Sequence, residues 1–317
     1  MKKDVSYYTN QFTKLRVDRV HGAAPHKPIL LLSIIELIEQ GKIQHNRIFL
    51  TPELISSFLK YWGKFGSENH RSDIAQPFFH LTSDKFWHLA PNSGFESTIE
   101  ARIKLKSLTA LRNAVNYGYF DQELFELLQQ SESRIELVTT LIQHWFPGRL
   151  GEVEELSQVD IFQEIQLRLF EQGGATYNAE EVKDEEQTFV RSGAFRRIVV
   201  SLYDHRCALC KLKIISLENQ NIVDGAHIKP FAEFRDDYFD NGLALCKNHH
   251  WAFDRGWVSI SSNYRILIAH HLFTEEPPEA SRSMRDFHGE LIYLPDEQKY
   301  HPRVEALQWH RDVWSIA

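Results

Sequence analysis

LALCKNHHWAFD, at residues 243–254, holds one of the three cysteines of a 317-residue chain, followed closely by two adjacent histidines. Neighbouring side chains on a regular helix or strand point in different directions, so His249 and His250 cannot both face one ligand from such an element. The two histidines therefore belong to one irregular metal site, to two different sites, or to a polar surface. The positions of the other cysteines bear on this choice.

All three cysteines have the spacing of a zinc site. Cys207 and Cys210 form a CxxC pair, whose tight turn can aim both sulfurs at one ion. Cys246 follows 36 residues after Cys210, and His249 completes a Cys3His pattern. Buried core cysteines or a redox-active CxxC are the alternatives, but a redox role lacks the surrounding βαβ pattern. We predict a structural zinc ion, because four protein ligands leave no open position for chemistry.

This assignment leaves His250 for a second site. Asp254 lies four positions later, and positions i and i+4 share one face of a helix, so the two side chains can bind one divalent cation together. Upstream, VDGAHIKPF has His227 in an apolar setting before a proline, which is typical of a strand that enters a turn. Asn241 begins NGLALC, the segment that leads back to the zinc pattern.

AHIKPF followed by NGLALCKNHHWAFDRG resembles the HNH nuclease motif, a ββα-metal finger, and the cysteines resemble those of its zinc-stapled subtype. YRILIAHHLF and LQWHRDVW are similar to the tail of an HNH family common in restriction endonucleases. The resemblance implies that His227 is the general base and that Asn241 orients the loop carrying it and approaches the metal. It also implies that His250 and Asp254 bind a catalytic Mg²⁺ or Mn²⁺ ion. Phosphodiester hydrolysis needs a base for the water and positive charge near the leaving oxygen.

The chain departs from the motif at Ala226, where many HNH nucleases carry an Asp or His metal ligand just before the general base. Asp224, two residues earlier, shares the same strand face and is the candidate substitute. Four further side chains are candidate phosphate or substrate contacts, with a structural or solvated role as the alternative: Lys229, Arg255, His310 and Arg311.

Residues 1–150 are expected to form a mainly helical domain that selects the target. HKPILLLSIIELIEQGKI predicts a buried helix that stops at Gly41. TPELISSFLKYWGKF begins with a Thr cap followed by Pro and Glu, a common helix start. QPFFHLTSDKFWHLAP predicts a hairpin with its turn at Ser83 and Asp84. A basic helical module of this kind can follow DNA phosphates, and a dimerisation or packing domain is the alternative.

APHKPILLLSIIELI, RSDIAQPFFHL, FWHL and LFELL together resemble the sulfur-binding domains that precede HNH modules in modification-dependent restriction enzymes. Those domains recognise DNA in which sulfur replaces a non-bridging phosphate oxygen. The resemblance implies an apolar cup, because sulfur is larger, softer and less well hydrated than oxygen. The candidates for the cup are Gln76, Pro77, Phe78 and His80. The candidates for contacts with the DNA backbone and bases are His26, Lys27, Arg71 and Arg102. For Pro77 and Phe78, an ordinary core position is the alternative.

The net charge of −7 is unevenly distributed. Residues 1–27 contain six bases and two acids, whereas residues 151–187 contain eleven acids and two bases. Because that acidic stretch accounts for −9, the remaining residues sum to +2, which is compatible with DNA binding. Three cysteines exclude a disulfide framework and suit a reducing cytoplasm. The start of the chain is not typical of a signal peptide, and the apolar run PILLLSIIELI is too short to span a membrane.

The sequence thus predicts an α+β protein in three parts. A helical modified-DNA recognition domain occupies residues 1–150, an acidic helix and linker occupy 151–187, and an HNH nuclease domain with a Cys3His zinc site occupies 188–317. The predicted function is type IV restriction of phosphorothioated double-stranded DNA with Mg²⁺ or Mn²⁺. The alternatives are an HNH endonuclease that reads a methylated base or a plain sequence, and a non-catalytic DNA-binding protein. Because one HNH site cuts one strand, a homodimer or successive nicking is expected.

Overall fold

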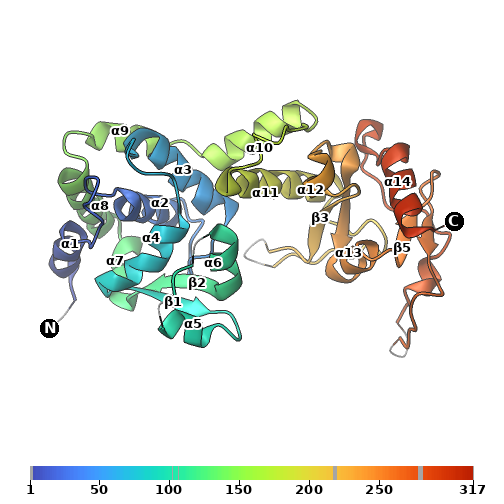
Figure 1. The fold of residues 1–317 in the computed structure, drawn as a ribbon, viewed down its shortest axis with the longest axis horizontal. Coiled ribbons are helices and arrows are strands. Elements are labelled where there is room, and N and C mark those ends of the chain that lie inside the picture. The colour runs from blue at the N-terminus through green and yellow to red at the C-terminus, as the bar shows by residue number, and fades with distance from the viewer. Residues whose placement is uncertain (1–2, 102, 106, 217–219, 278–280, 317) are drawn as a thin grey trace. The chain divides into compact units, whose positions relative to one another are not determined.

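The computed structural model describes residues 3–101, 103–105, 107–216, 220–277 and 281–316. Its helices and small sheets form two compact units (Figure 1). Unit 1 comprises residues 1–164 and 184–190, and unit 2 comprises residues 165–183 and 191–317. Among the described residues, no helix is both long enough and apolar enough to cross a bilayer. The predicted mixture of helices and strands is confirmed.

Unit 1 consists mainly of helices and includes one antiparallel pair of strands, β1 (Trp87–Pro91) and β2 (Val115–Phe120). Its helices are α1 (Val5–Thr13), α2 (His26–Glu39), α3 (Pro52–Phe65), α4 (Ala75–His80), η1 (Leu81–Asp84), α5 (Glu96–Glu100), α6 (Leu108–Ala114), α7 (Gln122–Gln129), α8 (Ser131–Trp145) and α9 (Leu150–Ser157). Helices α10 (Ile161–Glu171) and α11 (Glu185–Leu202) each contribute residues to both units.

The two helices predicted near the start of unit 1 are confirmed. Helix α2 is buried on nearly every side, and Gly41 follows it with a φ of 69°, a conformation that favours glycine. Helix α3 begins after Thr51, whose hydroxyl accepts a hydrogen bond from the Leu54 amide at 3.3 Å. The local capping signals therefore gave the correct helix boundaries.

The hairpin predicted over residues 76–91 is wrong. The first part of this stretch forms α4 and η1, and β1 pairs with the distant strand β2. The indole of Trp87 donates a hydrogen bond to the Phe78 carbonyl at 2.8 Å, and the two rings meet edge to face. A short aromatic run has no clear period, so tertiary contacts decide its structure.

The single acidic helix expected at the start of residues 151–187 is also wrong, because the chain forms two helices there, α9 and α10. Asp160 lies at the break, where its carboxylate accepts a hydrogen bond from the Gln163 amide and thereby starts α10. Part of the expected linker is ordered within unit 2. The Asp237 amide donates to the Ala175 carbonyl, and the Tyr177 amide donates to the Arg235 carbonyl.

Unit 2 has two antiparallel strand pairs and further short helices. Its strands are β3 (Val223–His227), β4 (Gly242–Cys246), β5 (Val258–Ile260) and β6 (Ile266–Ile268), and β3 pairs with β4 while β5 pairs with β6. Its helices after α11 are α12 (Phe231–Phe234), η2 (Phe239–Asn241), α13 (Lys247–Phe253), η3 (Arg285–Phe287), η4 (Gln298–Tyr300) and α14 (Val304–Trp314).

Strands β3 and β4 and helix α13 form the predicted ββα element. His227 pairs with Gly242 at one end of the sheet, and β4 leads directly into α13, which packs on both strands. Helix α11 approaches β3 so closely that a Cβ atom at Gly225 would lie 2.7 Å from the backbone of Arg196. Glycine is therefore required where this helix supports the strand that carries His227.

Candidate functional site

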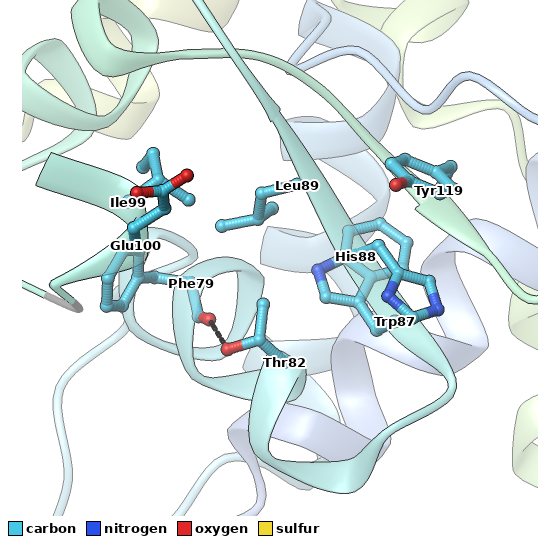
Figure 2. Close-up of a pocket in the computed structure, with 8 residues that line it drawn as sticks. All are labelled: Phe79, Thr82, Trp87, His88, Leu89, Ile99, Glu100 and Tyr119. Atoms are coloured by element: carbon cyan, nitrogen blue, oxygen red, sulfur yellow. Dashed lines mark hydrogen bonds between the residues drawn. The ribbon is translucent and has the colours of Figure 1, made fainter. Parts of the chain in front are cut away.

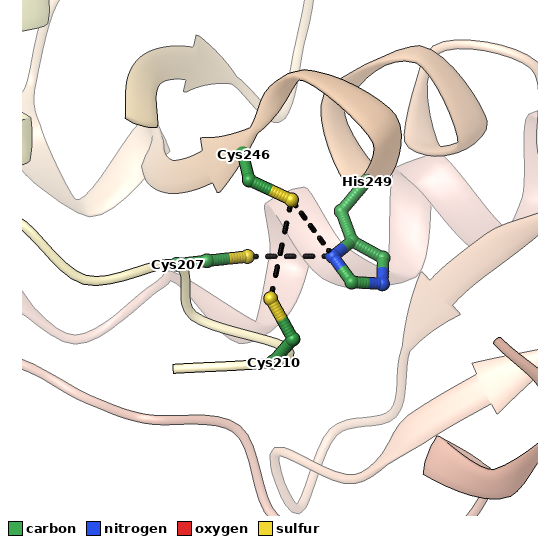
Figure 3. A group of neighbouring side chains, drawn as sticks. All are labelled: Cys207, Cys210, Cys246 and His249. Carbon is green, nitrogen blue, oxygen red and sulfur yellow. Dashed lines mark hydrogen bonds between the residues drawn. The ribbon is translucent and has the colours of Figure 1, made fainter. Parts of the chain in front are cut away.

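The predicted Cys3His cluster is present in unit 2 (Figure 3). Cys207 and Cys210 lie in the turn after α11, Cys246 ends β4, and His249 lies in α13. His249 Nδ1 is 3.1 Å from the Cys246 sulfur and 3.5 Å from the Cys207 sulfur, and the sulfurs of Cys210 and Cys246 are 3.9 Å apart. A tetrahedral zinc ion with ordinary bond lengths would place such atoms about 3.6 to 3.8 Å apart. The four side chains therefore fit zinc.

The electrostatics of the cluster also suit a cation. Hydrogen bonds from Cys207 and Cys210 hold the pKa of the Cys246 thiol far below its ordinary value. The bonds with Cys210 and Cys246 raise the pKa of Cys207 in turn. The thiols thus compete for the same protons, and a divalent cation would relieve that competition because it binds thiolates.

The adjacent histidines occupy two different environments. His249 is buried and aims Nδ1 at the sulfurs, whereas His250 lies among carboxylates. His250 Nδ1 is 3.8 Å from Asp224 Oδ2, and its Nε2 is 3.7 Å from Asp254 Oδ2. Among the three arrangements considered for these histidines, the structure favours two separate sites.

The two carboxylates lie on opposite sides of the His250 ring. One ion binds one ring nitrogen, so it would share Nδ1 with Asp224 or Nε2 with Asp254. Asp224 also lies 3.2 Å from Arg196 Nη1 and 3.5 Å from Lys247 Nζ. Within the part of the chain that the structure describes, the Cys3His cluster is the only group of three or more such side chains that converges as a metal site does.

His227 is the last residue of β3, and its ring stacks on Phe195 with a centroid distance of 4.0 Å and an interplanar angle of 6°. Its Nε2 lies 2.7 Å from Oδ1 of Asp237, a residue that sequence reasoning missed. No spacing rule marks Asp237, because the loop between β3 and β4 brings it to the histidine. The contact restricts rotation of the imidazole ring.

Asn241 is fully buried and uses its side chain to hold that loop. Its Oδ1 accepts from the Lys229 amide at 2.9 Å, and its Nδ2 donates to the carbonyls of Lys229 and Asp236, both at 3.1 Å. These contacts match the loop-orienting part of the expected role. The amide is committed to backbone groups, so it is not directed at an ion.

The other basic candidates of unit 2 divide into two groups. Lys229 and Arg255 lie over the rings of Phe234 and Trp251, at 3.8 and 3.9 Å. His310 and Arg311 are instead buried, and each donates a hydrogen bond to a backbone carbonyl. Burial lowers the pKa of His310 to about 4, although its bond to the Phe253 carbonyl opposes the shift. The buried pair therefore serves the packing of α14.

In unit 1, the structure brings His26 and Arg71 together. His26 Nε2 is 2.9 Å from the Arg71 carbonyl, and the His26 ring packs against Trp62 at 4.5 Å. Burial lowers the pKa of His26. The Arg71 residue itself is exposed. A neutral His26 can thus hold the backbone of a loop whose arginine faces solvent.

Lys27 is buried, and its ammonium is 2.5 Å from Asp84 Oδ2 and 2.9 Å from Ser83 Oγ. Burial lowers the pKa of Lys27, and the bond to Asp84 opposes this. This charge is neutralised inside unit 1 and is not presented to solvent. Its neighbour in the expected contact set, Arg102, lies outside the described residues.

The expected cup residues all lie on α4 but differ in exposure. Pro77 is buried and Phe78 is 0% exposed, whereas Gln76 is half-buried and His80 is exposed. Phe78 lies on the buried side of this helix, where its ring packs edge to face against Trp87. The outer surface of α4 therefore comes from its polar residues.

A separate pocket of about 340 Å³ lies beside α4, and none of its lining residues was among the candidate site residues of the sequence (Figure 2). It is lined by Phe79, Thr82, Trp87, His88, Leu89, Ile99, Glu100 and Tyr119. The rings of His88 and Tyr119 lie 5.1 Å apart across β1 and β2. The pairing of β1 with β2 brings His88 and Tyr119 together at the pocket. The incorrect hairpin prediction gave β1 a different partner, so the pocket could not be predicted from it.

Two family models match separate parts of the chain. Residues 6–159 match the ScoMcrA-like DNA sulfur-binding domain, and residues 207–261 match the HNH endonuclease model. No curated protein matches the chain.

Three solved structures show partial likeness to the chain. The modification-dependent TagI restriction endonuclease is 23% identical over 39% of this chain and 38% of its own length, with a TM-score of 0.29. The sulfur-binding domain of SprMcrA complexed with phosphorothioated DNA is 18% identical over 49% and 94%, with a TM-score of 0.37. The type IV phosphorothioation-dependent restriction endonuclease ScoMcrA is 12% identical over 77% and 93%, with a TM-score of 0.34. From the two family matches, the chain joins a ScoMcrA-like DNA sulfur-binding domain to an HNH endonuclease domain.

Proposed function

We propose that this protein is a modification-dependent, type IV restriction endonuclease that recognises phosphorothioated double-stranded DNA and hydrolyses its phosphodiester bonds. The observation that carries the proposal is the ββα element, which has His227 at the end of β3 and His250 on α13. Asn241 fixes the loop between them. Residues 6–159 match a DNA sulfur-binding domain, and such a domain would supply the selectivity for modified DNA that the ββα element lacks.

In this proposal His227 takes a proton from the attacking water, and a divalent ion, Mg²⁺ or Mn²⁺, is held by His250 with Asp224 or Asp254. The bound ion supplies positive charge for the phosphoryl oxygens and the leaving 3′ oxygen. The Cys3His zinc cluster fixes the start of α13 against the turn after α11, so that His250 keeps its position. The chemistry of the donor set fits, since carboxylate oxygen and imidazole nitrogen both bind these ions.

The two sides of His250 can be distinguished by experiment. We propose the Asp224 side, because Asp224 lies on the same strand as His227, whereas Asp254 is more than half exposed. Asp224→Asn should raise the Mn²⁺ concentration needed for half-maximal cleavage more than Asp254→Asn does. The opposite order would assign the ion to the Asp254 side.

Recognition of the mark is proposed for the surface near the start of α2 and along α4. Gln76 and His80 present side chains there, the buried Pro77 and Phe78 support them, and Arg71 is exposed beside His26. A sulfur atom is less well hydrated than oxygen, so a partly apolar surface gains more from the modified phosphate. Arg71 would hold the remaining negative charge.

The proposal also covers assembly and location. A double-strand break requires two HNH sites or two successive nicks, so we propose a homodimer on DNA, and a transient nicked product would instead indicate successive cuts. The three free thiols, two of them buried, fit a reducing cytoplasm, where they serve as zinc ligands.

A cleavage assay tests the proposed function. Matched phosphorothioated, methylated and unmodified duplexes are incubated with the protein and with Mg²⁺ or Mn²⁺, and nicked and linear products are measured. Only the phosphorothioated duplex should be cut, and His227→Ala should cut it ~10² to 10⁴-fold more slowly but keep binding. His271→Ala, which changes an exposed histidine of the same unit, should cut normally.

Each of the other outcomes would indicate a different function for this protein. Equal cutting of all three duplexes would contradict recognition of sulfur and indicate a nuclease that reads plain sequence. Preference for the methylated duplex would indicate a different mark. Binding without cutting under either ion would indicate a non-catalytic DNA-binding protein.

A further inference from the structure

A buried acid lies directly behind the proposed general base. Asp237 is 1% exposed, and its Oδ1 is 2.7 Å from His227 Nε2. We propose that Asp237 is a positioning residue, which fixes the proton and the orientation of His227, and that Arg191 holds Asp237 in place. This inference rests on the proposed function, because it assigns a role in activating the attacking water.

The contact decides which nitrogen of His227 can act as a base. A carboxylate only accepts hydrogen bonds, so Nε2 must carry the hydrogen. In neutral imidazole the other nitrogen, Nδ1, then has the lone pair that takes the proton from water. When Nδ1 has gained this proton the ring is positively charged, and the adjacent carboxylate stabilises that charge.

The ring cannot readily turn to exchange its two nitrogens. Phe195 covers one face at a centroid distance of 4.0 Å, and the Phe231 ring lies 5.7 Å away in a tilted arrangement. The His227 side chain is only 10% exposed. A packed ring with one fixed hydrogen bond has one orientation, which is the condition for a general base to meet its water.

Arg191 provides the charge that supports Asp237. Its Nε is 3.4 Å from Asp237 Oδ2, and its guanidinium lies over the rings of Tyr177 and Phe231, at 3.8 and 4.3 Å. The Arg191 side chain is 12% exposed. Arg191 therefore faces one oxygen of the Asp237 carboxylate, while the other oxygen, Oδ1, accepts from His227.

The backbone of Asp237 is fixed by a segment that sequence reasoning took for a linker. The Asp237 amide donates to the Ala175 carbonyl at 2.8 Å. Gly174 has a φ of 115°, and a Cβ atom there would lie 2.3 Å from Tyr238 Cα. Glycine is therefore required for this approach, and residues 174–177 form part of the support for the general base.

The tautomer of His227 is the direct test, and it requires no DNA. The full-length zinc-bound protein is labelled with ¹⁵N-histidine, and the His227 signals are assigned by their loss in His227→Gln. In the wild type, the proton should reside on Nε2. Asp237→Asn should change the tautomer or mix both forms, whereas Asp236→Asn, which changes the adjacent buried acid, should leave it unchanged. A wild-type proton on Nδ1 would overturn the inference.

Cleavage kinetics then show whether the contact serves the reaction. Single-turnover nicking by Asp237→Asn should fall by ~10² to 10⁴-fold, the range for loss of general-base catalysis, with DNA affinity unchanged. In a His227→Ala background, Asp237→Asn should cause no further fall, because it acts through the histidine. If the double variant instead shows the product of the two single reductions in nicking rate, the inference is overturned. Asp237→Glu should restore part of the rate, and bound zinc and melting temperature identify any variant that has lost its fold.

The two assays separate this inference from the proposed function. Wild-type protein that cuts no duplex would contradict the proposed function, whatever the His227 tautomer. Wild-type protein that cuts phosphorothioated DNA with the His227 proton on Nδ1 would contradict the role of Asp237 alone.

Discussion

His310 offers a sharp test of how unit 2 is held together. Its ring is 3% exposed, stacks on Phe253 at 3.8 Å, and makes hydrogen bonds with Ser259 and the Phe253 carbonyl. Burial lowers its pKa to about 4, and Arg311 adds to this shift. Protonation of His310 in the folded protein is therefore costly, whereas the unfolded chain binds the proton near the ordinary value of about 6.5.

The sign and size of the effect follow from these two values. Between pH 6.5 and pH 4 the unfolded chain binds more protons than the folded protein, so the stability of unit 2 is fully present above pH 6.5 and falls as pH decreases. For a folded pKa of about 4, the loss between pH 7.5 and pH 5 is about 2 kcal/mol. His310→Asn removes this titration, even if the lost packing lowers stability at every pH.

The assay compares urea unfolding of the wild type and His310→Asn at pH 7.5 and pH 5. Zinc release to a coloured chelator serves as the signal, because the Cys3His cluster lies in unit 2. Both proteins lose zinc affinity in acid, so the informative quantity is the difference between their two pH-dependent changes. That difference should be about 2 kcal/mol. Equal changes in both proteins would show that His310 binds its proton as readily in the folded protein as in the unfolded chain, and would refute the reasoning.

Three further changes test other parts of the structure. Cys246→Ser should lower bound zinc well below one ion per chain and unfold unit 2 at lower urea, as measured by metal analysis and denaturation, and full zinc content would contradict the Cys3His assignment. Gly225→Ala should destabilise unit 2 by roughly 2 kcal/mol or more, because the new methyl group meets the Arg196 backbone, and an unchanged urea midpoint would show that α11 can move away. Thr51→Ala should cost unit 1 about 1 kcal/mol through loss of the cap on α3, measured by thermal unfolding, with Thr51→Ser as a control that keeps the hydroxyl.

Local signals in the sequence predicted those parts of the fold in which neighbouring residues decide the outcome. The capping residue Thr51 predicted the start of α3, and Gly41, which has a positive φ, predicted the end of α2, because both signals act within one helical turn. The hairpin prediction failed because the partner of β1 is β2, a strand that no local turn connects to it. The break between α9 and α10 depends on Asp160, whose capping position a continuous apolar pattern did not reveal.

For the site, the sequence by itself predicted the Cys3His cluster and, through the resemblance to HNH nucleases, the ββα element that carries His227, Asn241 and His250. Metal-ligand spacing and the order of these residues along the chain are local properties, which survive without knowledge of the fold. The sequence also shows which side chains are charged, but not which of these charges are already paired inside the protein and which can contact DNA or an ion.

The tertiary structure alone decided how those charges are used. The sequence made Lys27 a candidate for contact with DNA, but Asp84 neutralises its charge in the interior. His250 lies between Asp224 and Asp254, so the choice of ion ligand became a question about two sides of one ring. Asp237 reaches His227 only because the loop before β4 folds back, since a hydrogen bond of 2.7 Å depends on the path of the chain rather than on spacing.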